Sequence, residues 1–174
     1  PKSIDWQALE ATRLGSKTAS PSPEGVLSDF GEWDSSRLYA PTVLRQGDLL
    51  SMWYTGFAWD GSVAIGLATS TDGIVWDKSD GNPFFQGVNE PAVLQLAPDD
   101  LRLYACNDSD GSIYLYESSD GGLTWSVPTL PVFSPSSDPA AWDRNVVCDP
   151  VVLYTGGIYY MFYEGGAIDD DYLA

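Results

Sequence analysis

The sequence predicts an all-β chain of β-propeller blades, each made of four antiparallel strands, with about two and a half blades in 174 residues. Two internal repeats predict this fold. The segment Trp33–Gly56 recurs without a gap as Trp142–Gly165, and Ile65–Gly73 recurs in part as the segment from Ile113 to Gly121. Strand-like units that repeat after about 40 to 50 residues, with no helical periodicity, are typical of propeller blades.

The repeats divide the chain into a leading segment and a partial propeller. Residues 1–32 contain an orphan strand near Trp6, which matches Trp76 and Trp125, followed by a connection rich in serine and proline. The partial propeller covers residues 33–174. We expect its blades at approximately 33–87, 88–138 and 139–174, the third being incomplete.

The first blade begins with a hairpin. Strands are predicted from Ala40 and over Leu49–Tyr54, with a turn at Gly47 between them, and their density of apolar residues indicates sheet faces that are both buried. A third strand is predicted over Val63–Ser70. A short fourth strand is expected to begin at Trp76.

The other blades follow the same order. In the second blade, strands are predicted over 89–94, 101–106 and 113–118, with a fourth at Trp125. The third blade has predicted strands from Asp149 and over Ile158–Tyr163, and its third strand is expected at 172–174.

Two turns share the pattern Ser-x-Asp-Gly followed by Trp, at Ser70–Trp76 and Ser118–Trp125. The pattern is close to the Asp-box of sialidase-like propellers. An Asp carboxylate can accept backbone N–H bonds across such a turn, glycine takes a positive φ, and the Trp packs beneath. We interpret both boxes as structural, because the carboxylate is satisfied by its own turn.

Composition restricts the partners. A formal net charge of −17 disfavours nucleic acid and anionic membranes, and leaves neutral molecules or cations. The absence of His removes Ser-His and Cys-His nucleophiles and the commonest transition-metal ligand. An acidic, lysine-poor composition is typical of saline or extracellular settings, although it assigns no compartment. Cys106 and Cys148 form a single pair, for which buried free thiols are favoured over a disulfide.

Three segments resemble the five-bladed β-propeller glycosidases, the furanosidase superfamily of arabinanases, β-xylosidases and fructan hydrolases. They are DPVVLYTGGIYYMFYEG (Asp149–Gly165), PTVLRQGDLLSMWYTG (Pro41–Gly56) and IGLATSTDGIVWDKSDGNPFF (Ile65–Phe85). The resemblance implies that three carboxylates, one from each of three blades, surround one sugar. They serve as a base or nucleophile, an orienting Asp and a general-acid Glu.

The residues before the first proline of each inner strand are Ala40, Glu90 and Asp149, and we expect them to converge at one mouth of the channel. Ala40 stands where the family has a carboxylate. The candidate catalytic residues are therefore Glu90, Asp149, Glu164 and Asp34, with Glu164 as the preferred acid, since it replaces the repeated Thr55. Candidate sugar-binding residues are Trp33, Arg37, Trp142, Asp143 and Arg144.

Two functions remain open. One is a glycoside-hydrolase-like protein that acts on or binds a neutral carbohydrate at the channel mouth. The other is a non-catalytic partial propeller that serves in carbohydrate binding or assembly, which Ala40 favours. No cofactor is expected, although carboxylates suit Ca²⁺. We also expect either a homo-oligomer, in which residues 1–14 of one chain complete the third blade of another, or part of a larger propeller.

Overall fold

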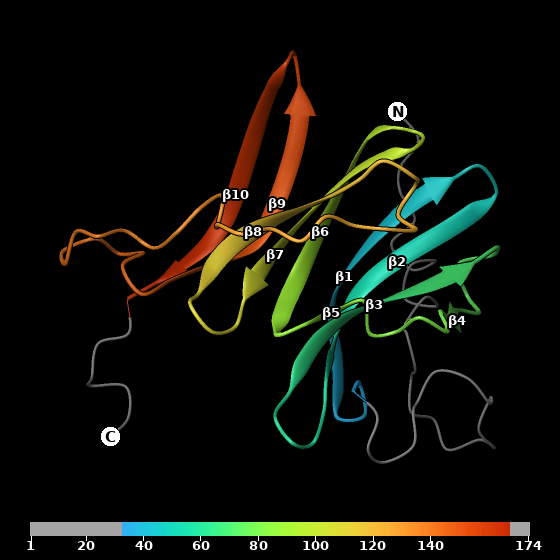
Figure 1. Ribbon diagram of the computed structural model, residues 1–174, viewed down its shortest axis with the longest axis horizontal. Coiled ribbons are helices and arrows are strands. Elements are labelled where there is room, and N and C mark those ends of the chain that lie inside the picture. The colour runs from blue at the N-terminus through green and yellow to red at the C-terminus, as the bar shows by residue number, and fades with distance from the viewer. Residues whose placement is uncertain (1–32, 168–174) are drawn as a thin grey trace, which may run out of the picture.

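The computed structural model describes residues 33–167 of the chain. These residues form ten strands, β1 to β10, and no helix, which confirms the all-β prediction (Figure 1). None of the described elements is a helix of the length and apolarity that a membrane crossing requires. The strands form three antiparallel sheets, which we call the first, second and third sheet in chain order.

The first sheet contains β1 (Arg37–Gln46), β2 (Leu49–Phe57), β3 (Val63–Ser70) and β4 (Asp77–Lys78), in that order. A short strand, β5 (Phe85–Gln86), also pairs with β3. The predicted hairpin, the third strand and the short fourth strand are confirmed. The apolar runs of β2 and β3 are almost entirely buried, as expected for a sheet that is covered on both faces.

The second sheet contains β6 (Val88–Ala97), β7 (Asp100–Asn107) and β8 (Ser112–Ser118). The fourth strand expected at Trp125 is wrong. The chain after Ser118 is irregular up to the start of β9, except for a single bridge between Ile113 and Phe133. Ser126 still contacts the edge of β8, because its N–H donates to the carbonyl of Glu117 and its hydroxyl accepts the Glu117 N–H.

The third sheet is the hairpin of β9 (Val146–Thr155) and β10 (Ile158–Gly166), joined by a turn at Gly156 and Gly157. Both predicted strands are confirmed. The strand expected at 172–174 and the orphan strand near Trp6 lie outside the described residues. In Figure 1 this hairpin forms one end of the row of sheets, beside β6 and β7.

Side chains between neighbouring sheets form the core. Trp53, Leu101 and Leu103 are buried between the first and second sheets. Tyr104, Ile113 and Val147 are buried between the second and third. The sheets therefore pack face to face in chain order, as blades do in a propeller.

Both Asp-box turns have the predicted internal hydrogen bonds. Asp72 Oδ1 accepts the N–H groups of Ile74 and Val75 at 2.8 and 2.9 Å. Asp120 Oδ1 likewise accepts those of Leu123 and Thr124 at 3.0 and 2.9 Å. These carboxylates are satisfied by their own turns, so the boxes support the fold.

Candidate functional site

The same backbone distortion occurs at the inner strand of each sheet. Ala40, Glu90 and Asp149, each followed by proline, have φ values of 47°, 53° and 48°. At each position the register shifts, so that the residue and its proline together face a single residue of the neighbouring strand. Such a bulge re-aims the side chain, and each positive φ costs of order 1–3 kcal/mol in a non-glycine residue. This repeated strain singles out the three positions that the sequence predicted to converge.

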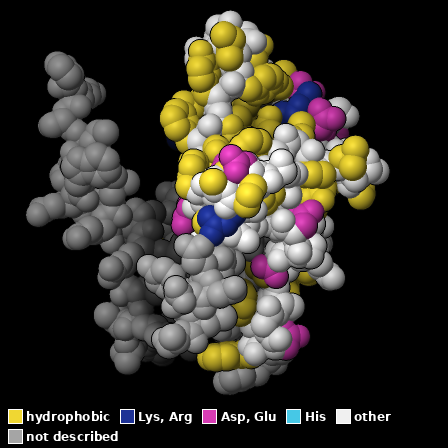
Figure 2. Space-filling model, turned by 90° about the vertical axis from the view of Figure 1, so that its left-hand side faces the viewer, with side chains coloured by type: hydrophobic (Ala, Val, Ile, Leu, Met, Phe, Trp, Pro, Cys, Tyr) yellow, Lys and Arg dark blue, Asp and Glu magenta, His cyan; other side chains and the backbone are white. Residues whose placement is uncertain are grey.

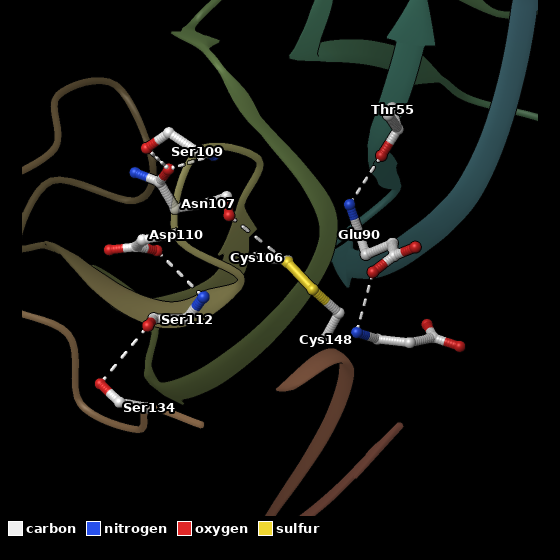
Figure 3. The surroundings of a disulfide bond; sticks show 10 residues. Thr55, Glu90, Cys106, Asn107, Ser109, Asp110, Ser112, Ser134 and Cys148 are labelled. Atoms are coloured by element: carbon white, nitrogen blue, oxygen red, sulfur yellow. Dashed lines mark hydrogen bonds between the residues drawn. A yellow bond between two sulfur atoms is a disulfide. The ribbon is translucent and has the colours of Figure 1, made fainter. Parts of the chain in front are cut away.

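Hydrogen bonds link these positions from one sheet to the next. The N–H of Glu90 donates to Oγ1 of Thr55 on β2 at 2.8 Å. The N–H of Asp149 donates to Oε2 of Glu90 at 2.9 Å. Figure 3 shows Glu90 between Thr55 and the start of β9. The distorted N–H groups of Glu90 and Asp149 are therefore each satisfied by a side chain of the preceding sheet.

A pocket of about 280 Å³ opens between the second and third sheets, beside Glu90. Glu90 and Glu164 both contribute to its wall, and Asp149 reaches Glu90 through its N–H. The other described residues of the wall come from the ends of β6, β7, β9 and β10: Asn89, Cys106, Asn107, Asp108, Gly111, Val146, Cys148, Gly165 and Gly166. The structure thus places Glu90 and Glu164 in one wall and the backbone of Asp149 beside Glu90, while Asp149 is not itself among the described residues of the wall.

Glu90 differs electrostatically from an ordinary glutamate. Burial raises the pKa of its carboxyl group above the usual 4.5, and the negative charges of Asp149 and Glu164 raise this pKa further. The hydrogen bond from the Asp149 N–H acts in the opposite direction without reversing the shift. A raised pKa favours the protonated form of Glu90, which is the form that a general acid requires.

A disulfide joins Cys106 on β7 to Cys148 on β9, with their Cα atoms 5.0 Å apart. The expectation of free thiols is therefore wrong. In the register of the strands, Cys106 lies opposite Asn89, the neighbour of Glu90, while Cys148 directly precedes Asp149. The bond thus ties β9, which carries Asp149, to β7, the strand that pairs with β6 beside Glu90 (Figure 3).

Asp34 lies away from this pocket. Its carboxylate is buried, forms an ion pair with Lys78 Nζ at 2.6 Å and accepts a hydrogen bond from the Tyr54 hydroxyl. In the third sheet, Asp143 accepts the equivalent hydrogen bond from Tyr163 at 3.0 Å. The repeated aspartate therefore anchors the loops that lead into β1 and β9.

The two repeated tryptophans also make equivalent local contacts. Trp33 packs beside Tyr54, with ring centroids 5.5 Å apart, and covers Gly56, where any side chain would collide with its ring. Trp142 stacks on Tyr163 at 5.6 Å and covers Gly165 in the same way, although its side chain remains 60% exposed. Neither is among the described residues that line the pocket.

The candidate arginines are held outside the pocket wall. The guanidinium of Arg37 lies over the ring of Phe57, 4.7 Å from its centroid. That of Arg144 donates to the carbonyl of Ala141 at 3.2 Å. Each guanidinium thus has a partner near the start of an inner strand, β1 for Arg37 and β9 for Arg144.

Among the described residues, one group of potential metal ligands is compact: Glu90, Cys106 and Cys148, whose ligand atoms lie within 4.8 Å of one another. Both sulfurs belong to the disulfide, so neither is a thiolate. The described carboxylates do not assemble a comparably compact trio for Ca²⁺.

Sequence reasoning missed Asn89 and Asp108 in the pocket wall. It also missed Tyr39, the residue before Ala40, where burial and then the charge of Glu90 raise the pKa of the hydroxyl. Tyr39 and Asn89 each stand just before a distorted residue, as Cys148 does. This shared position in the sequence is the signal that could have identified Tyr39 and Asn89.

No protein-family model and no curated protein matches the sequence. Among solved structures, a thermostable family-43 glycoside hydrolase is similar, with a TM-score of 0.63 and 19% identity over 78% of this chain. A family-32 β-fructofuranosidase from Bombyx mori matches 80% of the chain, with a TM-score of 0.58 and 18% identity. The chain has the fold of glycoside hydrolase propellers.

A family-117 glycoside hydrolase from the marine bacterium Zobellia galactanivorans has the same glycosidase-like fold. It matches 64% of this chain with a TM-score of 0.53 and 17% identity. The chain spans 48%, 32% and 34% of the family-43, family-32 and family-117 structures, respectively, so it covers less than half of each. At these identities the likeness establishes the fold alone.

Proposed function

We propose that the chain binds a neutral carbohydrate in the pocket beside Glu90, and that it takes part there in glycoside hydrolysis. The observation that supports this proposal most strongly is the convergence of Glu90, Asp149 and Glu164 from three strands of two sheets. Glycosidic bonds are cleaved between a protonated and an ionised carboxyl group. A set of neighbouring carboxylates with one raised pKa can supply both forms.

The structure changes which residue we favour as the proton donor. Sequence reasoning preferred Glu164, which is exposed, whereas Glu90 is half-buried and has the raised pKa. We propose Glu90 as the general acid. Asp149 or Glu164 then acts as the ionised partner, because Ala40 offers no carboxylate from the first sheet.

Charge supports a neutral ligand. The net charge is −17, and the described wall of the pocket contains Asp108 and two glutamates but no Lys or Arg. A uronic acid or a sulfated sugar would meet repulsion there. We propose no resident metal for this reaction.

Neutral arabino-, xylo- and fructo-oligosaccharides provide the test, with calorimetry for binding and chromatography for cleavage. We expect Glu90→Gln to abolish cleavage while it retains binding, since glutamine keeps the shape and the acceptor for the Asp149 N–H. Asp48→Asn, at the exposed β1–β2 turn, is the matched control. Cleavage by Glu90→Gln at the wild-type rate would exclude Glu90 as the acid.

A second candidate is a binding module without catalysis. Ala40 supports it. In the first sheet this residue has the same strained backbone as Glu90 and Asp149, with a φ of 47°, but it carries no carboxylate. In that case the same oligosaccharides bind but no product accumulates. Because no reaction takes place in that case, Glu90→Gln would change only the affinity for the oligosaccharide.

A further inference from the structure

The disulfide between Cys106 and Cys148 places its two sulfurs beside the carboxylate of Glu90. One ligand atom from each of these three residues lies within 4.8 Å of the other two. All three residues belong to the described wall of the pocket between the second and third sheets. The pocket therefore contains two sulfur atoms and one oxygen atom that could bind a metal, and the disulfide keeps both sulfurs from doing so.

The strands hold these three residues in place between two sheets. Cys106 on β7 lies opposite Asn89 on β6, and Cys148 on β9 directly precedes Asp149. The N–H of Asp149 donates to Oε2 of Glu90 at 2.9 Å, which fixes the carboxylate. A carboxylate has two oxygens, so this hydrogen bond is compatible with a bond from the other oxygen to a metal.

The spacing of the three ligand atoms suits a small tetrahedral cation. Zn²⁺ binds thiolates at about 2.3 Å and carboxylate oxygens at about 2.1 Å, so neighbouring ligand atoms of a tetrahedral site lie roughly 3 to 4 Å apart. Reduction frees the two sulfurs to separate by rotation of their side chains. Two thiolates and one carboxylate suit Zn²⁺, whereas Ca²⁺ and Mg²⁺ take oxygen ligands.

The charge around the pocket also favours a cation. Asp108 and Glu164 belong to its described wall, which contains no Lys or Arg, and the chain has a net charge of −17. Figure 2 views the molecule from the side on which the third sheet lies and shows more Asp and Glu than Lys and Arg side chains over this face. A negative potential raises the local concentration of cations.

Asn89 offers a partner for a water molecule at the fourth position of such a metal. Its Oδ1 is buried and accepts no hydrogen bond from any described group. Asn89 lies directly opposite Cys106, and opposite residues of an antiparallel pair extend their side chains from the same face. A zinc site with three protein ligands completes its tetrahedron with water. Such a water beside Cys106 would supply the donor that Oδ1 lacks.

We propose that reduction of the Cys106–Cys148 disulfide creates a Zn²⁺ site from the two thiolates and the carboxylate of Glu90. A dithiol carries out the reduction: its two sulfurs become a cyclic disulfide, and the protein gains two electrons and two protons as two thiols. Zn²⁺ then displaces the two thiol protons, which pass to the solvent, and forms two Zn–S bonds and one Zn–O bond. The oxidised protein has no thiolate and does not form the site.

Glu90 belongs both to this metal site and to the proposed carbohydrate site. A carboxylate bound to Zn²⁺ is ionised, so Glu90 cannot donate a proton to a glycosidic oxygen while the metal is bound. Reduction followed by metal binding thus stops the reaction. This consequence rests on the proposed function, whereas the metal site itself does not and is measured without sugar.

Zinc titration of the oxidised and reduced forms of the 174-residue chain tests the site, with a chromophoric chelator as competitor. The reductant is removed under argon beforehand. We expect one equivalent of Zn²⁺ to bind the reduced protein, and none of comparable affinity to bind the oxidised protein, which needs no substitution. Co²⁺ in place of Zn²⁺ should give sulfur-to-metal charge-transfer bands in the reduced protein alone.

Two substitutions in the reduced protein test the third ligand. Glu90→Gln should weaken Zn²⁺ binding about ten-fold or more, since even the outer partners of metal ligands contribute that much. Glu164→Gln removes a negative charge from the same pocket wall and is the matched control, which should weaken binding less.

Circular dichroism separates loss of the site from loss of the fold. If reduction unfolds the chain, Zn²⁺ should restore the strands, because binding to the folded form stabilises it. Three results would overturn the proposal: a reduced chain that stays unfolded with Zn²⁺, a folded reduced chain that binds Zn²⁺ no more tightly than the oxidised one, or wild-type affinity in Glu90→Gln.

Discussion

The backbone N–H of Asp149 donates to Oε2 of Glu90 at 2.9 Å, so the inner strands of two sheets meet at two carboxyl-bearing residues. The bond uses the backbone of Asp149, which leaves its side chain available. Ala40 adopts nearly the same φ at the equivalent position, so alanine is compatible with this backbone. Stability and ligand binding can therefore be separated at Asp149.

Asp149→Ala should reduce carbohydrate affinity while it lowers the free energy of unfolding by at most about 1 kcal/mol. A ligand in the pocket loses a charged partner, whereas the hydrogen bond to Glu90 remains. Calorimetry and thermal unfolding measure the two effects, with Asp48→Ala as the control. A fall in the thermal midpoint of more than about 10 °C with intact binding would reverse the assigned roles.

The pKa of Glu90 predicts a pH dependence. Because the folded-state pKa is raised above 4.5, the folded protein binds more protons than the unfolded chain between 4.5 and the shifted value. Its contribution to stability is therefore present at lower pH and is lost as the pH rises through that interval. Glu90→Gln should flatten this part of the urea stability profile. Parallel profiles for the two proteins would show that Glu90 titrates normally.

The Asp120 turn predicts the opposite behaviour at lower pH. Hydrogen bonds from the side chain and N–H of Thr124, and then from Ser118, lower the pKa of Asp120 from 3.8 to about 2. The stabilisation is present above pH 3.8 and is lost as the pH falls through about 2. Asp120→Asn should weaken the turn at neutral pH and reduce acid sensitivity. Acid unfolding of the two proteins, followed by circular dichroism, makes the comparison.

The disulfide should contribute to both stability and the site. Cys106 and Cys148 are separated by 42 residues, and closing a loop of that length in the unfolded chain is worth about 4 kcal/mol. Cys106→Ser with Cys148→Ser should lower the free energy of unfolding by that order and weaken carbohydrate binding, because β7, which pairs with β6 beside Glu90, is then no longer bonded to β9, which carries Asp149. A reductant should mimic the double variant. Unchanged binding would confine the bond to a structural role.

The sequence predicted the strands well where residues with the same structural role recur in the repeated units. The recurrence of Trp33 at Trp142 and the Asp-Gly turns predicted the strands, since each unit uses the same local physics. Interactions between different units were harder to predict from the sequence. The pairing of Cys106 with Cys148 depends on two sheets packing side by side, and the raised pKa of Glu90 depends on burial by that packing.

Other features were missed because local sequence rules did not predict them. The irregular chain near Trp125 keeps the Asp-box but forms no fourth strand. Positive φ at Ala40, Glu90 and Asp149 is unusual before proline, so propensity argued against it.

The most direct test of the account is a chemical-shift titration of the carboxyl-labelled protein with neutral arabino-, xylo- and fructo-oligosaccharides and with an oligouronate. We predict that a neutral oligosaccharide shifts the Glu90, Asp149 and Glu164 resonances together, that Asp48 does not respond, and that Asp149→Ala weakens binding about ten-fold or more. An oligouronate should not bind. Binding of the oligouronate beside Asp149, or neutral-sugar binding that leaves all three carboxyl groups unshifted, would contradict the account.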